Sequence, residues 1–471
     1  MPRIVVIGGG PAGLSAALRA AELGAQTVVV ASGEFGGMAA NDGPVPVRTL
    51  AHAARLMRDA RQLGDYGVVV GEPTLDFPRL LARVQQVTGD VREHSARLPD
   101  FGALGITVHE HTGNARFVDP QTIETESGLR FEADRFILCT GGMSRKLALP
   151  GFELSCTRRD AWSLKSVPSS MIVVGGGDTG VQVASVFNAF GSRIQVFQHG
   201  PRLVPTADEA VSAEVEKAFR ASGIGVRTSF GELESFEKTA TGVRMNFSVD
   251  GVPDQAEAAV LVVAVGWVAN TATLNLPAAG VELNERGFIR VNEYLQTSAP
   301  HIFAAGDITG RLMLVPQALQ EGFMAGTNAA QDEKEPYIST LSPVGSFTDP
   351  EYAQVGLTEA QARQSHDALS TVVPFGSVAR TIIDGRTAGV CKLITDRKTC
   401  QILGCHIVGE RAVEIAQIVA VAMAGGLRVD DLLRLPISFP TYAGILTRAA
   451  AAAARELNLP LRVGWAGIRQ P

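Results

Sequence analysis

Hydrophobic and polar positions follow one order twice along this chain, and that order is typical of a strand, a glycine turn and a helix. The first copy, RIVVIGGGPAGLSAALRAAELGAQTVVVAS, begins at Arg3, where aliphatic residues precede the glycines and an Ala/Leu-rich segment runs to Gly24. The second copy, SMIVVGGGDTGVQVASVFNAFGSRIQVFQHGPR, lies far downstream. Since each copy predicts one strand–helix–strand unit, the chain is predicted to contain two dinucleotide-type folds.

The rest of the chain predicts supporting elements and a third domain. Residues Thr74 to Leu98 have the pattern of an exposed amphipathic helix, and QDEKEPY, after about Asn328, indicates a connector. Beyond it the alternation predicts an α+β domain, in which the alanine run Ala449 to Ala454 favours a packed helix. The predicted strands are near 344–347, 390–394 and 401–408, and the predicted helices are near 413–424 and 445–457.

The composition of the chain limits the kinds of partner that it is expected to bind. The 471 residues are 46% hydrophobic and 19% charged, which suits about three globular domains. The net charge of -6 gives no basic surface for nucleic acid or an anionic membrane, so small-molecule partners are expected. No run approaches the roughly 18 apolar residues of a membrane span, and IVVIGGG is too short for a signal peptide, so we expect no membrane insertion.

The cysteines favour a reducing, cytoplasmic location. There are five, without CxxC or histidine-rich spacing, which argues against a disulfide framework or a metal site. Cys400 and Cys405 lie in TCQILGCHIVG, which predicts a strand. An odd separation on a strand places the two side chains on opposite faces, so a redox pair is not expected there.

The first fingerprint, GxGxxG, predicts a dinucleotide site because it follows a strand and opens a helix. Gly8 permits the tight turn, Gly10 lets backbone N–H groups approach a pyrophosphate, and Gly13 allows close packing of helix on strand. The acid that commonly holds the ribose, about twenty residues on, is missing. Ser32 or Glu34 would substitute for it, or either is an ordinary loop residue, and both interpretations stay open.

The second fingerprint consists of Gly175, Gly177 and Gly180. Its second strand ends at Gln198, where an acid would bind the adenosine 2′-hydroxyl and repel a 2′-phosphate. Without that repulsion, and with His199 and Arg202 nearby, the sequence leans towards NADPH. The alternative is that these are solvated loop residues of an NADH site or of a site without preference.

Further motifs give the pattern a family. They are FILCTGG (136–142), VVAVGWVANT (262–271), TSAPHIFAAGD (297–307), QALQEG (317–322) and FTDPEYAQVGLTEAQA (347–362). Their order and spacing resemble the pyridine nucleotide-disulfide oxidoreductase family of FAD enzymes, which includes dihydrolipoamide dehydrogenase, glutathione reductase and mercuric reductase. The resemblance covers essentially the whole chain.

The resemblance implies an α/β fold with two Rossmann-like dinucleotide-binding domains plus a C-terminal α+β dimerisation domain, and hence a homodimer. FAD would use residues 1–155 and 269–335, NADPH or NADH would use 156–268, and 340–471 would form the interface. FAD would lie along the first glycine turn, with Asp307 accepting hydrogen bonds from its ribityl chain, unless Asp307 only forms the turn. The other cofactor-binding residues implied are Ala115, Thr140, Gly141 and Gly266.

One stretch departs from the family. Against the pattern GGxCxxxxCxPxK, Ala39 stands for the first cysteine, Pro44 for the second and Arg48 for the lysine, whereas Pro46 keeps its place. A thiolate is the nucleophile of disulfide exchange, and neither alanine nor proline supplies one. Disulfide reductase activity by the family mechanism is therefore excluded on the sequence.

Other residues of that machinery have also changed. The family's HPTxxE, given by the partner subunit, is here FPTYAG, so Phe439 replaces the histidine and Gly444 the glutamate. Gln182 replaces the glutamate that pairs with the lysine, which leaves Arg48 to stabilise a reduced flavin or to pair with another carboxylate. Asp178 stands where relatives place an aromatic gate, and a helix-capping role is favoured for it. The candidate catalytic residues are Arg48, Gln182 and Phe439.

Flavin chemistry survives these losses, since hydride transfer from nicotinamide needs stacking geometry and the cofactor carries the reactivity. The leading hypothesis is an FAD-dependent NAD(P)H oxidoreductase that reduces a quinone or similar diffusible acceptor, resembling disulfide-less NAD(P)H:quinone reductases. Soluble pyridine nucleotide transhydrogenase and a flavin-binding redox sensor without turnover are the alternatives. An apolar pocket floor would suit a quinone edge, or be plain packing; its residues would be Met38, Ala39, Pro44, Phe439 and Tyr442.

Overall fold

The computed structural model describes residues 1–97, 101–339 and 341–460, and the chain divides into two compact units. The first unit contains residues 1–50, 76–146 and 266–339. The second contains the described residues of 51–75, 147–265 and the segment after 339. The finer division into four segments stays a prediction, and residues 461–471 of its last segment lie outside the described residues.

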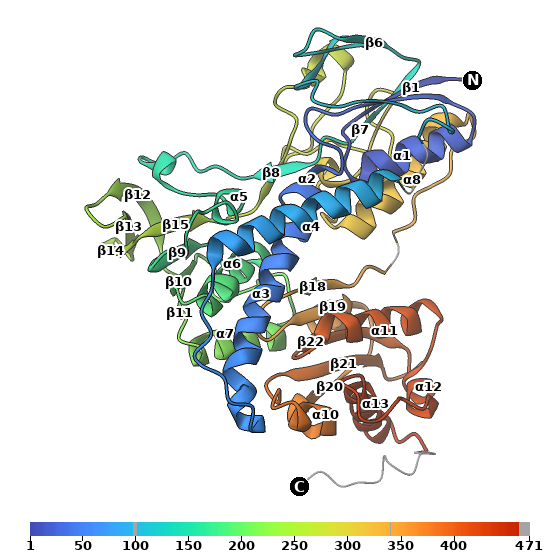
Figure 1. The fold of residues 1–471 in the computed structure, drawn as a ribbon. Coiled ribbons are helices and arrows are strands. Elements are labelled where there is room, and N and C mark those ends of the chain that lie inside the picture. Colours follow the sequence, from blue (N-terminus) through green and yellow to red (C-terminus); the bar gives the residue numbers. More distant parts are fainter. Residues whose placement is uncertain (98–100, 340, 461–471) are drawn as a thin grey trace. The chain divides into compact units, whose positions relative to one another are not determined.

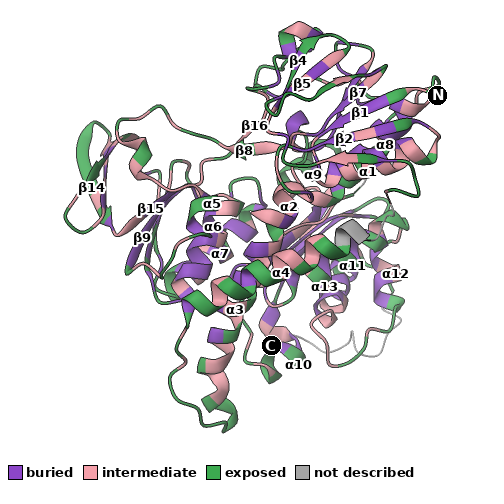
Figure 2. Ribbon diagram, turned by 45° about the horizontal axis from the view of Figure 1, so that its top comes forward, coloured by how far each residue is buried: buried purple, intermediate pink, exposed green. Residues whose placement is uncertain are grey.

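A five-stranded parallel sheet forms the core of the first unit, in the order β17-β7-β1-β2-β3. Residues Ile4 to Ile7 of β1 are aliphatic and at most 3% exposed, because helices cover the sheet (Figure 2). The strands are β1 (Arg3–Ile7), β2 (Gln26–Val30), β3 (Thr107–His109), β7 (Arg135–Leu138) and β17 (Ile302–Ala304).

Helices α1 (Pro11–Glu22) and α8 (Val315–Ala330) lie side by side on this sheet (Figure 1). Their backbones approach so closely that a Cβ at Gly322 would lie 2.1 Å from the carbonyl oxygen of Ala12. The predicted exposed helix is α4 (Phe77–Arg97), and Leu98 lies outside the described residues. The unit also contains α2 (Gly37–Asn41), η3 (Leu276–Ala279), η4 (Asp307–Thr309), β4 (Ala115–Asp119), β5 (Thr122–Thr125), β6 (Arg130–Glu132), β8 (Gly142–Ser144) and β16 (Trp267–Ala269).

The second unit repeats the parallel arrangement in a four-stranded sheet, β11-β10-β9-β15. Its strands are β9 (Ser170–Val174), β10 (Arg193–Gln198), β11 (Gly225–Thr228) and β15 (Val260–Val263), with helices α5 (Arg158–Ala161), α6 (Asp178–Ala189) and α7 (Glu209–Ala221). An antiparallel sheet adjoins it, made of β12 (Glu232–Lys238), β13 (Val243–Val249) and β14 (Val252–Ala258), after η2 (Phe152–Leu154). Helix α3 (Pro44–Gln62) and η1 (Leu63–Tyr66) precede these elements in the chain.

The C-terminal part of the second unit is an antiparallel sheet, β18-β19-β22-β21-β20, with helices packed on it. The strands are β18 (Val344–Ser346), β19 (Tyr352–Gly356), β20 (Ala368–Pro374), β21 (Val390–Asp396) and β22 (Ile402–Val408). The helices are α9 (Glu359–Ser365), η5 (Phe375–Ser377), α10 (Ala379–Ile383), α11 (Ala412–Ala424), α12 (Val429–Arg434) and α13 (Gly444–Glu456). The alanine run lies in α13 and is packed in the core, as predicted. The predicted α/β class is confirmed.

The strand predicted around Cys400 begins later than expected. Cys400 has a φ of 61°, a left-handed conformation that ends strand pairing, and β22 starts only at Ile402. The sequence missed a different pair: the Sγ atoms of Cys391 and Cys405, on adjacent strands β21 and β22, are 3.8 Å apart. All five cysteines are free thiols.

Candidate functional site

The first glycine turn joins β1 to α1 in the first unit. Gly8 has a φ of +119°, and a Cβ there would lie 2.2 Å from the carbonyl oxygen of Cys139. A Cβ at Gly13 would lie 1.9 Å from the carbonyl oxygen of Gly8. At Gly10 the nearest atom to such a Cβ is 3.8 Å away, so this position is open. Packing thus requires glycine at both ends of the turn, whereas the middle leaves backbone room for a ligand.

Helix α1 begins at this opening with Gly10 as its N-cap and no side-chain cap. The first N–H groups of a helix carry partial positive charge and lack intrahelical partners, so they form an anion-binding end. The turn and the helix end together fit the pyrophosphate of a dinucleotide.

Ser32 and Glu34, the two residues after β2 that were predicted to bind the ribose, differ in their surroundings. Ser32 is exposed, whereas Glu34 forms an ion pair with Arg92. A carboxylate that sequence reasoning missed, Glu110, accepts a hydrogen bond of 2.6 Å from the Phe35 N–H. Glu110 follows β3 directly, and the only signal for it was its place at the end of a parallel strand. Both interpretations of Ser32 and Glu34 stay open.

Thr140 and Gly141 lie beside Asn270. The Thr140 hydroxyl donates to the Asn270 carbonyl at 2.7 Å, and the Asn270 N–H donates to the Gly141 carbonyl at 3.0 Å. Gly266 has a φ of +110°, and no atom lies within 4 Å of where its Cβ would be, whereas Ala115 is buried at the start of β4. Hydrogen bonds thus join the Thr140–Gly141 segment to the segment that contains Asn270. The contact of these residues, Ala115 and Gly266 with a cofactor remains a prediction.

Asp307 follows a glycine that no residue with a Cβ replaces without strain. Gly306 has a φ of 80°, and a Cβ there would lie 2.9 Å from the Cβ of Ala12 in α1. Asp307 is half-buried and begins the short helix η4. The AAGD turn thus places a carboxylate at the carboxyl end of β17, the edge at which parallel sheets bind ligands.

Glu321 is a buried carboxyl that the sequence did not single out. Its side chain accepts a hydrogen bond of 2.8 Å from the Gly306 N–H, and Arg311 lies 3.7 Å away. Burial raises its pKa to about 6, against the opposing effect of those partners. Its motif, QALQEG, was visible, but its role depends on α8 lying against the AAGD turn.

The pH dependence of stability should report on Glu321. A carboxyl whose pKa is raised in the folded state stabilises the fold below its unfolded value of 4.5, and that stabilisation is lost as pH rises through about 6. The loss amounts to about 2 kcal/mol. Glu321→Gln keeps an acceptor for Gly306 and removes the titration, so thermal unfolding of this variant should be flatter across that pH window. The exposed Glu282→Gln is the control, and an unchanged slope in Glu321→Gln would contradict the assignment.

The cysteine-free stretch lies at the start of α3. Ala39 is in the short helix α2, and Pro44 is the first residue of α3, a position that suits proline because its missing N–H has no helical partner. Arg48 is half-buried one turn further along α3. No cysteine occurs between Gly33 and Leu50, so no thiol is available here for disulfide exchange.

The second glycine turn, in the second unit, has the same construction. Gly175 has a φ of +107°, and a Cβ there would lie 2.3 Å from the Ala264 carbonyl oxygen. A Cβ at Gly180 would lie 1.8 Å from the Gly175 carbonyl oxygen. Around Gly177, the N-cap of α6, nothing lies within 4 Å of that position. This turn therefore also fits a dinucleotide pyrophosphate.

The capping role predicted for Asp178 is wrong. Gly177 is the N-cap of α6, and Asp178, the first helical residue, instead accepts a hydrogen bond of 2.5 Å from the Tyr352 hydroxyl. Burial raises the pKa of Tyr352, which is 3% exposed, so it remains a phenol that donates. Gln182 donates its side-chain amide to the Asp178 carbonyl at 3.1 Å. The start of α6 is thus tied to the C-terminal sheet, a contact between residues 174 apart in sequence.

The residues predicted to meet the adenosine end of the nucleotide already have protein partners. Gln198 accepts a hydrogen bond of 2.8 Å from the Gly176 N–H, and His199 lies 3.7 Å from Glu232. Arg202 donates to the carbonyl of Pro205 at 3.0 Å. The sequence could not show these partners, because it gives the positions but not the direction of each side chain.

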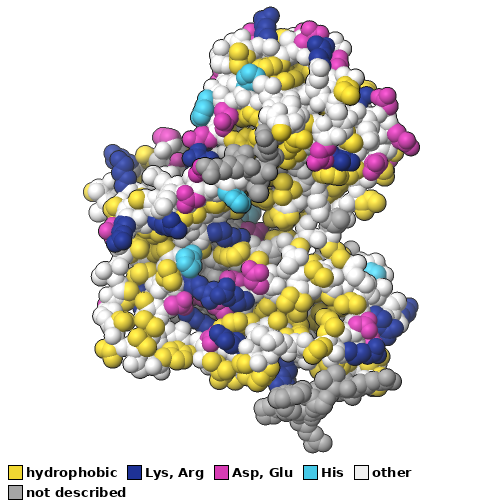
Figure 3. All heavy atoms as spheres, turned by 45° about the vertical axis from the view of Figure 1, so that its right-hand side comes forward, with side chains coloured by type: hydrophobic (Ala, Val, Ile, Leu, Met, Phe, Trp, Pro, Cys, Tyr) yellow, Lys and Arg dark blue, Asp and Glu magenta, His cyan; other side chains and the backbone are white. Residues whose placement is uncertain are grey.

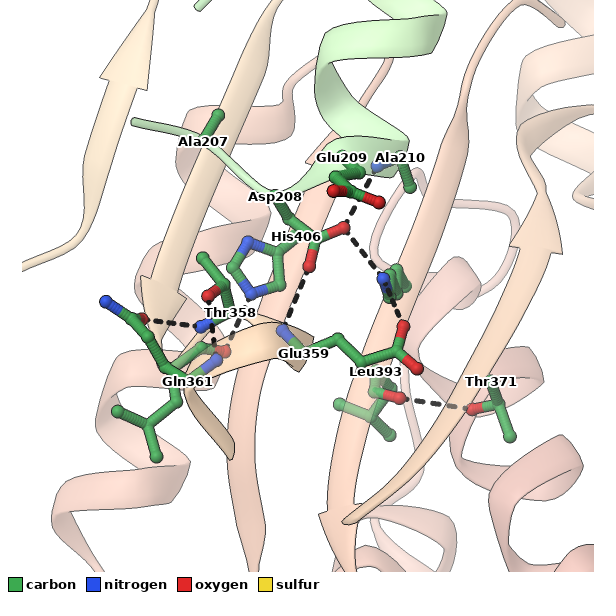
Figure 4. A network of polar contacts seen from close by, with 12 residues as sticks. Ala207, Asp208, Glu209, Ala210, Thr358, Glu359, Gln361, Thr371, Leu393 and His406 are labelled. Atoms are coloured by element: carbon green, nitrogen blue, oxygen red, sulfur yellow. Dashed lines mark hydrogen bonds and ion pairs between the residues drawn. The ribbon is translucent and has the colours of Figure 1, made fainter. Parts of the chain in front are cut away.

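The loop after β10 ends in a buried ionic network (Figure 4). Asp208 caps α7 by accepting from Ala210, and it also accepts from the Glu359 N–H at 3.0 Å. Lys392 lies 2.7 Å from Asp208 and 2.6 Å from Glu359. Burial alone would lower the pKa of Lys392, but its hydrogen bonds to the two carboxylates raise it. The network fixes the end of this loop on strand β21.

Phe439 and Tyr442 lie before α13. Phe439 is 71% exposed, and the Tyr442 hydroxyl donates to Asp384 at 2.6 Å. Gly444 is the first residue of α13. The predicted pocket floor joins residues of both units and stays a prediction.

Two further observations concern the described surface. Basic, acidic and hydrophobic side chains are all present on the face in Figure 3. Within the same residues, no cluster of side chains has the arrangement of a metal site, and no helix has the length and hydropathy to cross a membrane.

Comparison with known proteins identifies the family to which this architecture is similar. Residues 2–322 match the family model described as pyridine nucleotide-disulphide oxidoreductase, and residues 342–450 match the dimerisation domain of that family. A mercuric reductase of Lysinibacillus sphaericus is 32% identical over 452 residues, 95% of this chain and 82% of the relative. A dihydrolipoyl dehydrogenase of Thermus scotoductus is 32% identical over 464 residues, 95% of this chain and 96% of the relative.

The solved structures give the same fold. The HOCl-induced flavoprotein disulfide reductase RclA from Escherichia coli aligns with a TM-score of 0.85 over 95% of this chain and 99% of its own. Its sequence is 24% identical, so this likeness concerns the fold alone.

Proposed function

The chain belongs to the pyridine nucleotide-disulphide oxidoreductase family, and from that premise we propose that it is an NAD(P)H oxidoreductase without a redox-active disulfide. Its acceptor is a diffusible molecule, a quinone or a similar electron carrier. FAD and NAD(P)H are the cofactors of this family, and the two glycine turns fit them. Bound FAD supplies the two-electron chemistry, accepting hydride from the nicotinamide and passing the electrons on.

The observation that carries the proposal is the replacement of both cysteines. Ala39 and Pro44 have no nucleophilic atom, so the relatives' sulfur chemistry lacks its first reactant here. Cys139 does not substitute for them, because it is buried behind the first glycine turn and burial raises its pKa far above the usual range. An acceptor must therefore take electrons without a protein disulfide.

The chain's own residues bind and orient in this scheme. The backbone at Gly10 and Gly177 is open to the two pyrophosphates, and helix ends α1 and α6 favour their negative charge. Arg48 is the cation placed in the cysteine-free stretch, where a positive charge would stabilise negative charge on a reduced flavin. Phe439 and Gly444 replace the groups that handle a leaving thiolate, which is consistent with a reaction that has none.

The protein is proposed to act as a cytoplasmic homodimer. Residues 342–450 match a dimerisation domain, and several hydrophobic side chains of this part are exposed in the single chain: Val372, Ile418, Val421, Leu435 and Phe439. A second subunit would cover such a surface.

The first experiment is an anaerobic titration of the FAD-containing protein with NADH and with NADPH, followed by flavin absorbance. We expect one equivalent to reduce the flavin without a long-wavelength thiolate–flavin band. Steady-state assays should then show turnover with benzoquinone or menadione, and none with oxidised glutathione, lipoamide or Hg(II).

The double variant Ala39→Cys/Pro44→Cys is the matched control, because restored thiols should consume a second equivalent of nucleotide. Turnover of the wild type with a disulfide, or failure with every quinone, would contradict the proposal. Transhydrogenation is the second candidate, since FPT followed by the alanine-rich α13 resembles the FxxPT-type sequence and alanine-rich helix of soluble transhydrogenases. Hydride exchange between NADPH and an NAD analogue that outpaces quinone reduction would favour it.

A further inference from the structure

The end of β10 determines which nicotinamide nucleotide the second unit can hold. In a dinucleotide-binding fold the residue at the end of the second strand faces the adenosine ribose, and NADPH differs from NADH only by a phosphate at its 2′ position. A phosphate carries about two negative charges at neutral pH, so selection for it requires cations that are free to reach it. The partners of Gln198, His199 and Arg202 therefore decide the preference.

Gln198 has one polar group committed to the protein. Its side-chain oxygen accepts a hydrogen bond of 2.8 Å from the Gly176 N–H, within the second glycine turn. The amide nitrogen is then the group of Gln198 that is left for a ligand, and it is an uncharged donor. Such a donor suits a ribose hydroxyl and gives a phosphate little compensation for its lost hydration.

Three basic side chains at the ends of β10 and β11 each have protein partners. Nη2 of Arg202 donates to the carbonyls of Pro205 at 3.0 Å and Ala207 at 3.3 Å, whereas Nη1 is buried, lies 3.6 Å from Glu209 and has no hydrogen-bond partner. The remaining two are Arg227, which is 2.8 Å from Asp254 and stacks over Phe247, and His199, which is 3.7 Å from Glu232. Each of these side chains thus has a carboxylate within 4 Å.

The loop that carries Arg202 is held along its length. The Val204 N–H donates to the Gly176 carbonyl at 2.7 Å, and Leu203 and Val204 are fully buried. The Ser212 hydroxyl donates to the Leu203 carbonyl at 2.8 Å, and Asp208 joins the network with Lys392 (Figure 4). Arg202 is thus held by two carbonyl contacts within a loop whose neighbouring residues are buried.

We propose that the second unit selects NADH over NADPH, because Gln198 offers the 2′ position an uncharged donor and Arg202 is held by carbonyl groups of its own loop. The inference rests on the proposed function only in taking this turn as the nicotinamide nucleotide site. This inference differs from the preference for NADPH that the sequence predicted, because the sequence showed the basic residues and not their partners.

Equilibrium binding tests this without turnover. Isothermal titration calorimetry of the FAD-containing protein with NAD⁺ and NADP⁺, and in parallel with ADP and 2′,5′-ADP, should give at least about tenfold weaker binding for each 2′-phosphorylated member. Equal binding within threefold, about 0.65 kcal/mol, or tighter binding of the phosphorylated member, would overturn the proposal.

Variants identify the residues. Gln198→Arg should raise the affinity for NADP⁺ by about tenfold relative to NAD⁺, since it adds a cation that no carboxylate holds. Arg202→Lys should leave the ratio unchanged, and its selective loss of NADP⁺ binding would overturn the assignment of Arg202. If the protein prefers NADP⁺ and still reduces quinones fast, the inferred NADH preference is wrong and the proposed function stands. If none of the four ligands binds, the proposed function is contradicted too.

Discussion

Gly177→Ala is expected to weaken nicotinamide nucleotide binding by about 10- to 100-fold and to leave the fold intact. Nothing lies within 4 Å of a Cβ at this position, and Gly177 has an extended conformation that alanine also adopts. The added methyl would meet only a ligand pyrophosphate at the start of α6. Calorimetric binding of NAD⁺, with thermal unfolding of the same samples, checks both halves of the expectation.

Two other glycines serve as controls for this variant. Gly180→Ala places a Cβ 1.8 Å from a backbone oxygen, so it should lower the unfolding temperature as well as the affinity. Gly64→Ala, in η1 with open space around it, should change neither property. Wild-type affinity in a folded Gly177→Ala would show that the nucleotide does not approach this turn.

Lys392→Met is expected to destabilise the protein by about 3–5 kcal/mol, because removal of one partner leaves buried charge uncompensated. The Lys392 side chain is 7% exposed and that of Asp208 3%, and Glu359 lies within 2.6 Å of the same ammonium group. Burial alone would raise the pKa of Asp208, but its hydrogen bond with Lys392 lowers it, so removal of Lys392 takes away the cation that compensates this buried carboxylate. The midpoint of urea unfolding measures the loss.

The matched control is Lys217→Met, which removes an exposed lysine paired with Glu214 on α7 and should have little effect. The double variant Lys392→Met/Asp208→Asn should recover part of the stability, since it also removes one of the two carboxylates that lose their cation. A loss no larger in Lys392→Met than in the surface control would refute the importance of the network for folding.

The sequence predicted the parts of this fold that depend on short spacing. The two GxGxxG turns fell where the structure has them, between β1 and α1 and between β9 and α6, because a strand, a tight turn and a helix are encoded within about thirty residues. The absence of a cysteine pair was equally plain, since it concerns the identity of residues and not their contacts.

Predictions about individual side chains were less successful when the partner was distant in the chain. Asp178 was expected to cap its helix, but its hydrogen-bond partner, Tyr352, is 174 residues away. Glu321 became notable only once α8 was seen to bring it to Gly306. The position of Arg202 suggested a phosphate ligand, whereas folding of its own loop supplies carbonyl acceptors.

The sequence by itself therefore determined the class of the protein, the two turns that fit dinucleotides and the loss of the sulfur nucleophiles. Only the tertiary structure decided which polar groups are left for a ligand. The physical reason is that a buried or half-buried polar side chain must satisfy its hydrogen bonds with whatever the fold brings near it. Those neighbours, such as Glu359 and Lys392 for Asp208, come from strands and loops far away in the chain.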